Sequence, residues 1–232
     1  MKTINQIILG VLLGDFITAF IHWLSDNYLD PRKIKNSFLF NIAIGFELHH
    51  FIPRTILSNT YFENIQNQLS LCLIVLVLII IFAKKILYNN FFGIISTLLL
   101  VSFSNIIHRF SHLRYDELNG ILKFLQKNNI LIGNDEHKIH HCVNQHIKYG
   151  VINKYTNYIY DYLNIWKILE NIIYYLFNIK PTSAGLVEDY NILYDKKLKK
   201  IMNSKIPKIL NKKEFLFYKN KLINYFKNDN NT

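Results

Sequence analysis

The stretch Leu-Ser-Leu-Cys-Leu-Ile-Val-Leu-Val-Leu-Ile-Ile-Ile-Phe-Ala, residues 69–83, decides the fold class of this chain. It is the densest part of a segment, residues 64–83, that carries no charged side chain. A helix needs about 20 consecutive, mostly apolar residues to cross the hydrocarbon core of a bilayer, and this segment supplies them. The sequence therefore predicts a membrane protein built from helices.

Two other segments are also long and apolar enough to cross a bilayer. Residues 86–107 carry no charge, and only Lys84, Lys85 and a short Tyr-Asn-Asn stretch separate their apolar part from the first segment. These two segments predict a helical hairpin. Residues 4–24 form the third candidate, and Asp15 interrupts them. A buried carboxylate in a membrane segment is costly and is usually functional.

The composition favours helices over other classes of structure. The chain has 232 residues, enough for one domain, and its 8 glycines and 4 prolines are too few for a loop-rich or all-β protein. The net charge of +11 comes without a nucleic-acid-binding motif, so we expect a basic face against anionic lipid headgroups and no nucleic-acid partner. We predict an all-α integral membrane helical bundle of about three spans plus interfacial helices.

Several features argue against a secreted protein, although Met-Lys-Thr before an apolar stretch imitates a signal peptide. Asp15 interrupts that stretch, no small-residue cleavage pattern follows, and the helix continues into His22 and Trp23. Cys72 and Cys142 give no sign of an oxidised scaffold, so no disulfide between them is expected.

Three spans would place all nine histidines on one side of the membrane. If the first span ends near His22, the hairpin leaves from that side and returns to it. The same side carries all but three of the 27 lysines and arginines, the exceptions being Lys2, Lys84 and Lys85. The positive-inside rule makes this face cytosolic.

Three more segments are apolar without being predicted to cross. Residues 38–51 are too short and predict an interfacial helix that ends in His49 and His50, and residues 155–177 predict a second one. From residue 195 onward lysines alternate with apolar residues, which indicates either a surface helix on headgroups or a flexible end. We divide the chain into a membrane domain, 1–190, and a basic C-terminal tail, 191–232.

The histidines fall into five tight clusters, each beside or just after an apolar run. Neutral imidazole is a good ligand for iron, zinc and copper, and nine imidazoles exceed what one structural zinc requires. The clusters are His22, His49–His50, His108 with His112, His137 with His140–His141, and His146. They predict a multinuclear metal centre at the membrane surface.

Helical spacing would bring ligands together within these clusters. His108 and His112 are four residues apart, so both imidazoles share one helix face and can grip one metal. His22 and Asp26 repeat this spacing with a carboxylate as the second ligand, and Asp15 lies on the same helical stripe.

The cluster of His137 with His140–His141 adds a branched arrangement. On a helix, His137 points the same way as His140 or His141, and this adjacent pair fans out toward two metals. Each cluster alone has an ordinary explanation, such as a satisfied core histidine or a chance spacing. The joint pattern on one membrane face is more specific, and it favours a metal centre.

The donor set narrows the choice of metal. No His-Glu-x-x-His motif is present, and one catalytic zinc would take three protein ligands and leave six histidines unexplained. Bis-histidine haem would need pairs on facing membrane helices, whereas these clusters lie at helix ends. Two irons with about four nitrogen or oxygen ligands each would use most of the set, and such a pair activates O2 against an unactivated C–H bond. A C–H substrate that lives in a membrane is a lipid chain.

Around these clusters the chain resembles a known family. The motifs are Gly14-Asp15-Phe16, His22-Trp23-x-x-Asp26, His49-His50-x-x-Pro53, Asn105-x-x-His108-x-x-Ser111-His112, His137-x-Ile139-His140-His141, Tyr149, Asn157, Trp166-x-x-Leu169-Glu170 and Lys180-Pro181. Across about residues 10–190 they resemble the lipid desaturases of the Kua and plasmanylethanolamine desaturase family, which includes the bacterial carotenoid regulator CarF and the plant fatty acid desaturase that acts on phosphatidylglycerol. The sequence departs from the family pattern at Glu47 and Leu48, where the glutamate usually abuts the paired histidines, and at Glu136, where some members carry a histidine.

The resemblance implies an oxidoreductase, a membrane lipid desaturase with two non-haem iron ions and O2 as co-substrate. Its implied reaction converts the alkyl ether phospholipid plasmanylethanolamine to a vinyl ether plasmalogen, with electrons from NADH through a cytochrome b5-type donor. The implied location is the endoplasmic reticulum or an equivalent membrane, with the active site facing the cytosol. Asp26 would be a ligand or would orient one, and Asp15 is a candidate partner of His22. The implied catalytic metal ligands are His22, Asp26, His49, His50, His108, His112, His137, His140 and His141, with His146 as a further metal ligand.

Three alternatives stay open. A trans acyl-chain desaturase of phosphatidylglycerol shares the chemistry and the motifs. A non-catalytic metal-binding membrane protein would keep the clusters without turnover, and a zinc hydrolase would bind zinc tightly and need neither iron nor O2. The headgroup, the chain length, the redox partner and the oligomeric state are not fixed by these residues.

Overall fold

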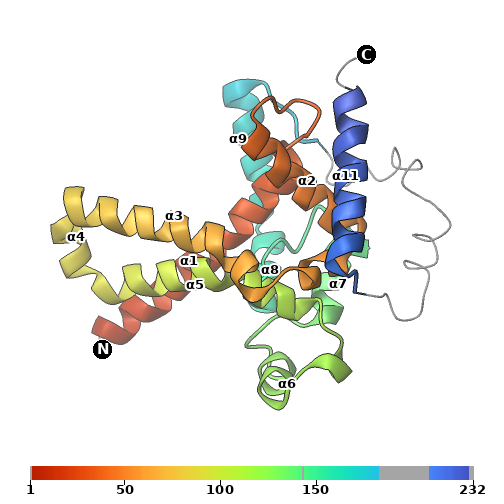
Figure 1. Cartoon of the computed structure of the whole chain (residues 1–232). Helices are drawn as coiled ribbons and strands as arrows, with labels where there is room; N and C mark the ends of the chain where they lie inside the picture. The colour runs from red at the N-terminus through yellow and green to blue at the C-terminus, as the bar shows by residue number, and fades with distance from the viewer. Residues whose placement is uncertain (1, 143, 183–208, 230–232) are drawn as a thin grey trace. The chain divides into compact units, whose positions relative to one another are not determined.

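The structure, a computed structural model, describes residues 2–142, 144–182 and 209–229 (Figure 1). Every regular element in these ranges is a helix, which confirms the predicted all-α fold class. The chain forms two compact units and passes between them several times. The first unit comprises Met1–His22, Thr60–His137 and Lys148–Tyr162, and the second comprises Trp23–Asn59, Lys138–Ile147 and Leu163–Thr232.

Three helices are long and apolar enough to cross a membrane, as predicted. They are α1 (Lys2–Tyr28), α3 (Tyr61–Phe82) and α5 (Phe91–Ser111). α3 and α5 pack side by side and confirm the predicted hairpin (Figure 1). The expected span over residues 86–107 starts later than predicted, because Lys84–Asn89 form the separate short helix α4 and Asn90 leaves the helical conformation.

The backbones of α1 and α5 approach each other closely within the first unit. A Cβ on Gly10 would collide with the carbonyl oxygen of Gly93. The hydroxyl of Thr97 donates to both glycine carbonyls, at 3.0 Å to Gly10 and 2.9 Å to Gly93. In a bilayer, apolar side chains gain little by exchanging lipid contacts for protein contacts, so helices associate through close packing. Small residues allow this close packing. This contact fixes α5 against the part of α1 that leads to His22.

The remaining elements of the first unit follow α5. They are η2 (Tyr115–Glu117), α6 (Gly120–Lys127), the beginning of α7 (Asn134–Cys142) and α8 (Lys154–Tyr162). The loop before α8 is tied down, because the N–H of Ile132 donates to the carbonyl of Ile152 at 2.7 Å. The side chain of Asn134, the first residue of α7, donates to the carbonyl of Ser111 at the end of α5 at 3.0 Å, so α7 begins near the end of α5.

The second unit is organised around α2 (Ser37–Phe51), which realises the helix predicted over residues 38–51. Asn36 caps it, since its side chain accepts from the backbone N–H groups of Phe38 and Leu39. One face of α2 packs against α11 (Lys212–Asp229), and the rest of the unit includes η1 (Pro53–Ser58) and α9 (Ile165–Phe177). The buried cluster that joins α2 and α11 contains Phe40, Ile44, Leu48, Phe51, Ile52, Leu210, Tyr218, Leu222 and Phe226.

Two expectations about the C-terminal third of the chain change. The single helix predicted over residues 155–177 is wrong, because Asn164 adopts a left-handed backbone with φ of 51° and separates α8 from α9. The tail after residue 195 was open between a surface helix and a flexible end. Residues 212–229 form α11, with one face buried in protein, while residues 195–208 lie outside the described part of the chain.

Candidate metal centre

The first unit contains a compact set of three histidines. His108 lies in the last turn of α5, His112 directly follows that helix, and His137 comes from α7. The Nε2 atom of His108 is 2.8 Å from Nε2 of His137 and 3.1 Å from Nε2 of His112. All three residues are buried. The predicted i, i+4 pair is therefore joined by a third imidazole from a distant part of the sequence.

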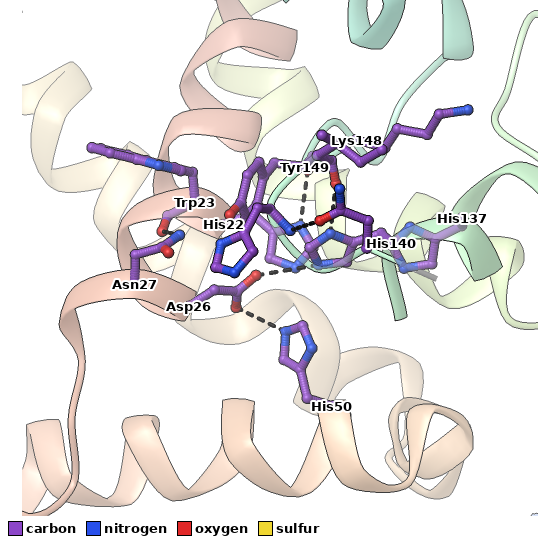
Figure 2. A network of polar contacts seen from close by, with 12 residues as sticks. His22, Trp23, Asp26, Asn27, His50, His137, His140, Lys148 and Tyr149 are labelled. Carbon is purple, nitrogen blue, oxygen red and sulfur yellow. Dashed lines mark hydrogen bonds and ion pairs between the residues drawn. The ribbon is translucent and has the colours of Figure 1, made fainter. Parts of the chain in front are cut away.

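His22 belongs to the same unit and lies beside this set. Its ring centroid is 5.4 Å from that of His108 and 6.2 Å from that of His137. Its Nδ1 is 2.8 Å from the carbonyl oxygen of Tyr149 (Figure 2). A carbonyl only accepts, so Nδ1 carries the proton and donates, and Nε2 keeps the lone pair that a metal needs.

The second unit contains a second set, centred on a carboxylate. Asp26 Oδ1 is 2.9 Å from Nε2 of His50, and Asp26 Oδ2 is 3.3 Å from Nε2 of His140 (Figure 2). The three side chains come from the last turns of α1, α2 and α7. All of them are buried.

The remaining histidine pair of the second unit lies next to this set. The ring of His141 is 4.7 Å from that of His49 and 4.9 Å from that of His50, by centroids. The rings of the adjacent residues His140 and His141 both lie near His50. That this pair serves two metals stays a prediction. The Nδ1 of His140 donates to the carbonyl of Ile147 at 2.8 Å, which again leaves Nε2 to face the ligand set.

Both sets fit a metal ion by their geometry and by their donors. Within each set the ligand atoms lie within 4.8 Å of one another, and the shortest separations are near 3 Å. Nitrogen ligands at about 2.0–2.1 Å from a metal are separated from one another by distances of this size. One set offers three imidazoles and the other offers two imidazoles and a carboxylate, which are donors that suit iron.

The electrostatics of His50 follow from its carboxylate neighbour. Burial alone would lower the pKa of His50. The Asp26 carboxylate outweighs this effect through its charge and its hydrogen bond, with a further contribution from Glu47, and the pKa is raised. Asp26 is thus an effective partner for positive charge at this position.

A polar network stands beside the first set on α7 and α8. Lys148 Nζ donates to Glu136 at 2.7 Å, and the hydroxyl of Tyr158 donates to the same carboxylate at 2.9 Å. Burial would raise the pKa of Glu136, but these two bonds and the lysine charge hold it below its ordinary value. Glu136 stands where some family members carry a histidine, and in this protein it forms an ion pair with Lys148.

Asp15 has a partner on α8. Its Oδ2 accepts a hydrogen bond from the hydroxyl of Tyr160 at 3.1 Å, and the ring of Tyr160 packs edge-on against Phe16. Burial and the charge of Asp15 raise the pKa of Tyr160. The suggested pairing of Asp15 with His22 stays a prediction, whereas its bond to Tyr160 ties α1 to α8.

The structure distributes the nine predicted catalytic residues between the two units. His146, the tenth predicted metal ligand, is exposed and lies outside both groups of converging ligand atoms. Its role as a ligand stays a prediction. Cys72 and Cys142 are free thiols, as expected, and Cys142 is exposed. The first unit holds His22, His108, His112 and His137, and the second holds Asp26, His49, His50, His140 and His141.

Sequence reasoning missed the backbone groups that orient two of the ligands. The carbonyls of Ile147 and Tyr149 fix the protons of His140 and His22. A carbonyl exists at every position, so residue type gives no signal for it. Tyr149 and Asn157 stood out only through the family resemblance, which assigned them no role.

The comparisons with known proteins point to one family. The family model described as a lipid desaturase domain matches residues 11–184. A "probable fatty acid desaturase" of Acanthamoeba polyphaga mimivirus is 29% identical over 203 residues, covering 83% of this chain and 90% of the relative. No solved structure matches this chain.

Two further relatives carry different names within this family. Mouse plasmanylethanolamine desaturase 1 is 24% identical over 192 residues, covering 78% of this chain and 68% of the relative. A chloroplastic fatty acid desaturase 4-like protein of Arabidopsis thaliana is 27% identical over 177 residues, covering 75% of this chain and 61% of the relative. All three relatives are named desaturases, but two are named for fatty acids and one for plasmanylethanolamine.

Proposed function

Because the chain belongs to the lipid desaturase family, we propose that it is a di-iron, O2-dependent desaturase that converts plasmanylethanolamine into the corresponding vinyl ether plasmalogen. The plasmanylethanolamine desaturases among its relatives support this substrate. The single observation that carries the metal stoichiometry is that each unit holds its own buried set of three converging ligands. One set per ion accounts for two irons.

The two sets have distinct donors. Two histidines and one carboxylate, as in Asp26, His50 and His140, form the ligand type found in many non-haem iron enzymes that use O2. The three histidines of the first unit are suited to a second ion of the same kind. When bound, such a pair of irons supplies the reactivity toward O2 that removes hydrogen from an unactivated C–H bond.

The chain's own residues orient the ligand atoms and balance charge at the proposed metal centre. His22 and His140 present Nε2 because backbone carbonyls hold their Nδ1 protons, and Asp26 balances positive charge near His50. The buried setting of the ligands keeps bulk water away from a reactive centre. Glu47 and His49 also lie buried on α2, next to His50.

The proposed reaction balances with an external electron donor. The alkyl ether chain loses one hydrogen from each of two neighbouring carbons, and a C=C bond forms between them. O2, two electrons and two protons, together with those two hydrogens, give two molecules of water. The electrons come from NADH through a cytochrome b5-type protein. The enzyme works in the endoplasmic reticulum or an equivalent membrane, with its site on the cytosolic face, where basic side chains hold the lipid phosphate.

Lipid analysis in cells that lack plasmalogens tests this function. Cells expressing the wild-type chain should gain vinyl ether phospholipids, while cells expressing His108→Ala should not. Tyr162→Ala is the matched control, since Tyr162 is an exposed, uncharged residue at the end of α8 and its variant should restore vinyl ethers like the wild type. A wild-type chain that is well expressed, loaded with iron and silent for vinyl ethers would overturn the proposed substrate.

A second candidate function has its own support. The Arabidopsis relative, which is 27% identical, is named a fatty acid desaturase, and the mimivirus relative carries a similar name. A trans acyl-chain desaturase of phosphatidylglycerol would show a new acyl double bond in the same lipid extracts. Iron that binds but gives neither product would favour a non-catalytic metal-binding protein.

A further inference from the structure

Asn157 makes two hydrogen bonds to a single residue at the edge of the first unit's histidine set. Its Oδ1 accepts from the N–H of Gly150 at 2.7 Å, and its Nδ2 donates to the carbonyl of Gly150 at 2.8 Å. Asn157 lies on α8 and is only 1% exposed. Its buried amide is therefore paired at both ends by one short piece of backbone, residues 149–150, which also contacts His22.

One peptide plane connects Asn157 with His22. The N–H of Gly150 and the carbonyl of Tyr149 belong to the same planar peptide unit, and in a trans peptide they point in opposite directions. Asn157 holds the N–H end of this plane, and His22 Nδ1 holds the carbonyl end at 2.8 Å. A plane that is pinned at one end presents its other end in a fixed direction.

Gly150 is required for this arrangement. A Cβ at this position would lie 2.6 Å from Oδ1 and 3.1 Å from Cγ of Asn157. Any other residue would push the asparagine side chain away from the backbone that it holds. The close approach of Asn157 to Gly150 thus depends on both residue types.

We propose that Asn157 is a positioning residue of the metal centre, which acts on His22 through the Tyr149–Gly150 peptide. By holding this peptide, Asn157 keeps the carbonyl of Tyr149 aimed at Nδ1 of His22, which fixes the Nδ1–H form and the ring orientation. Nε2 is then presented as a ligand before any metal arrives. This inference rests on the proposed role of His22 as a ligand. Partners of this kind typically change metal affinity by 10–100-fold when they are removed.

The first test uses the full-length protein without metal. In 15N-labelled protein in lipid nanodiscs, the imidazole nitrogen shifts of His22, assigned by comparison with His22→Ala, should show the Nδ1–H form alone. Asn157→Ala should convert this signal into a mixture of the two neutral forms. A wild-type His22 in the Nε2–H form, or an unchanged signal in Asn157→Ala, would overturn the proposal whether or not the protein is a desaturase.

The second test measures binding of Co2+ alone, through its visible absorption bands. Asn157→Ala and Gly150→Ala should each weaken the His22-dependent part of Co2+ binding by about tenfold and alter its bands. Asn157→Asp keeps an acceptor for the N–H of Gly150 and should restore most of the affinity. Tyr162→Ala, at an exposed position of α8, is the control and should bind Co2+ like the wild type.

These outcomes separate the positioning role from a structural role and from the metal proposal itself. A purely structural asparagine would leave Asn157→Asp, with its buried carboxylate, no better than Asn157→Ala, and this result would overturn the proposal. Helical content and elution volume identify variants that do not fold. If a variant does not fold, the 15N signal of His22 in the wild-type protein still tests the proposal. A wild-type chain that binds no Co2+ would instead remove the proposed metal centre.

Discussion

His108 is the residue on which the first unit's ligand set depends most directly. Its Nε2 is the atom that lies near both other nitrogens, at 2.8 Å from His137 and 3.1 Å from His112. Without it, only two imidazoles remain in the set, and they come from different parts of the chain. The position of His108 in the last turn of a packed membrane helix holds its side chain in place.

Replacing His108 should therefore reduce the bound metal. We expect His108→Ala to hold about one iron where the wild type holds two, because one set of three loses a member while the other is intact. His146→Ala is the informative comparison, since His146 is exposed and should lose little iron. Iron and protein measured together in purified samples give the ratio. An equal loss in both variants would make His146 a ligand after all.

Glu136 gives a prediction about pH. Its pKa is lower in the folded protein than its ordinary value of 4.5, because the bonds from Lys148 and Tyr158 outweigh burial. A lowered folded pKa adds stability above the ordinary value, and this stability is lost as the pH falls through the folded pKa. In Glu136→Gln, we expect a loss of about 0.5–1 kcal/mol at pH 7, because solvent screens this partly exposed ion pair, and the loss should shrink below pH 4.5. Thermal unfolding of the wild type and of Glu136→Gln in detergent, at pH 7 and below pH 4.5, measures the loss of stability. A loss that is the same at both pH values would contradict the prediction.

Candidate ligand residues can be recognised in a sequence, whereas the sequence does not show which of them lie close together in the fold. Spacing correctly paired His108 with His112 on one helical turn, because i, i+4 geometry is local. Spacing could not add His137 to that pair or set His50 beside Asp26, because these contacts depend on the tertiary fold. It also could not reveal that carbonyls orient the rings.

At the scale of elements, α11 supports a helix that carries ligands. The side chains of Leu222 and Phe226 are buried in the cluster that includes Ile44 and Leu48 of α2. Leu48 directly precedes His49 and His50 in the sequence. The lipid desaturase match ends at residue 184, before α11 begins. α11 therefore packs from outside the matched region against the helix that carries the candidate ligands His49 and His50.

Leu222→Ala should lower stability by about 2–5 kcal/mol, because this leucine is fully buried and its removal leaves a cavity. Leu216→Ala, at a position of α11 that is 45% exposed, should change stability by less than about 0.5 kcal/mol. Thermal unfolding compares the two variants. Similar values for both would mean that the face of α11 that packs on α2 contributes little to the fold.

The contact between α1 and α5 gives a second prediction at this scale. Ala is a better helix former than Gly, so Gly45→Ala in α2, which has open space around it, should gain about 0.5–1 kcal/mol. Gly10→Ala should instead cost about 1–3 kcal/mol, because its methyl group collides with the carbonyl of Gly93. The yield of folded protein and its unfolding temperature report both effects. Gains in both variants would mean that the two helices can move apart freely.

The sequence predicts long helices well and their ends and neighbours less well. Apolar length identified α1, α3 and α5, because crossing a bilayer imposes one length on any span. It missed the break at Asn164, because an asparagine in an apolar amphipathic run is compatible with helix until its backbone turns left-handed. The docking of α11 on α2 depends on residues far apart in the chain, so local pattern could not reveal it.

At the scale of the whole molecule, metal and fold depend on each other. Each unit buries a group of imidazoles, and in the second unit a carboxylate, which a bound cation would partner. Ligands that bind only the folded state stabilise it in proportion to the logarithm of their concentration over Kd. Removing iron with a chelator should lower the unfolding temperature, and adding Fe2+ without O2 should restore it. An unfolding temperature that is indifferent to iron would contradict metal binding by the folded protein.

The helix α7 has a consequence for how the protein is made. It supplies His137 to one ligand set and His140 to the other, so both sets stay incomplete until this helix has been synthesised. At about 5–20 residues per second, the chain from α2 to α7 takes on the order of ten seconds to emerge from the ribosome. During that time the early histidines are already in the membrane without their third partners. Under the proposed function, metal can therefore be bound fully only after α7 has been synthesised, and a chain that stops before α7 would lack one member of each candidate ligand set.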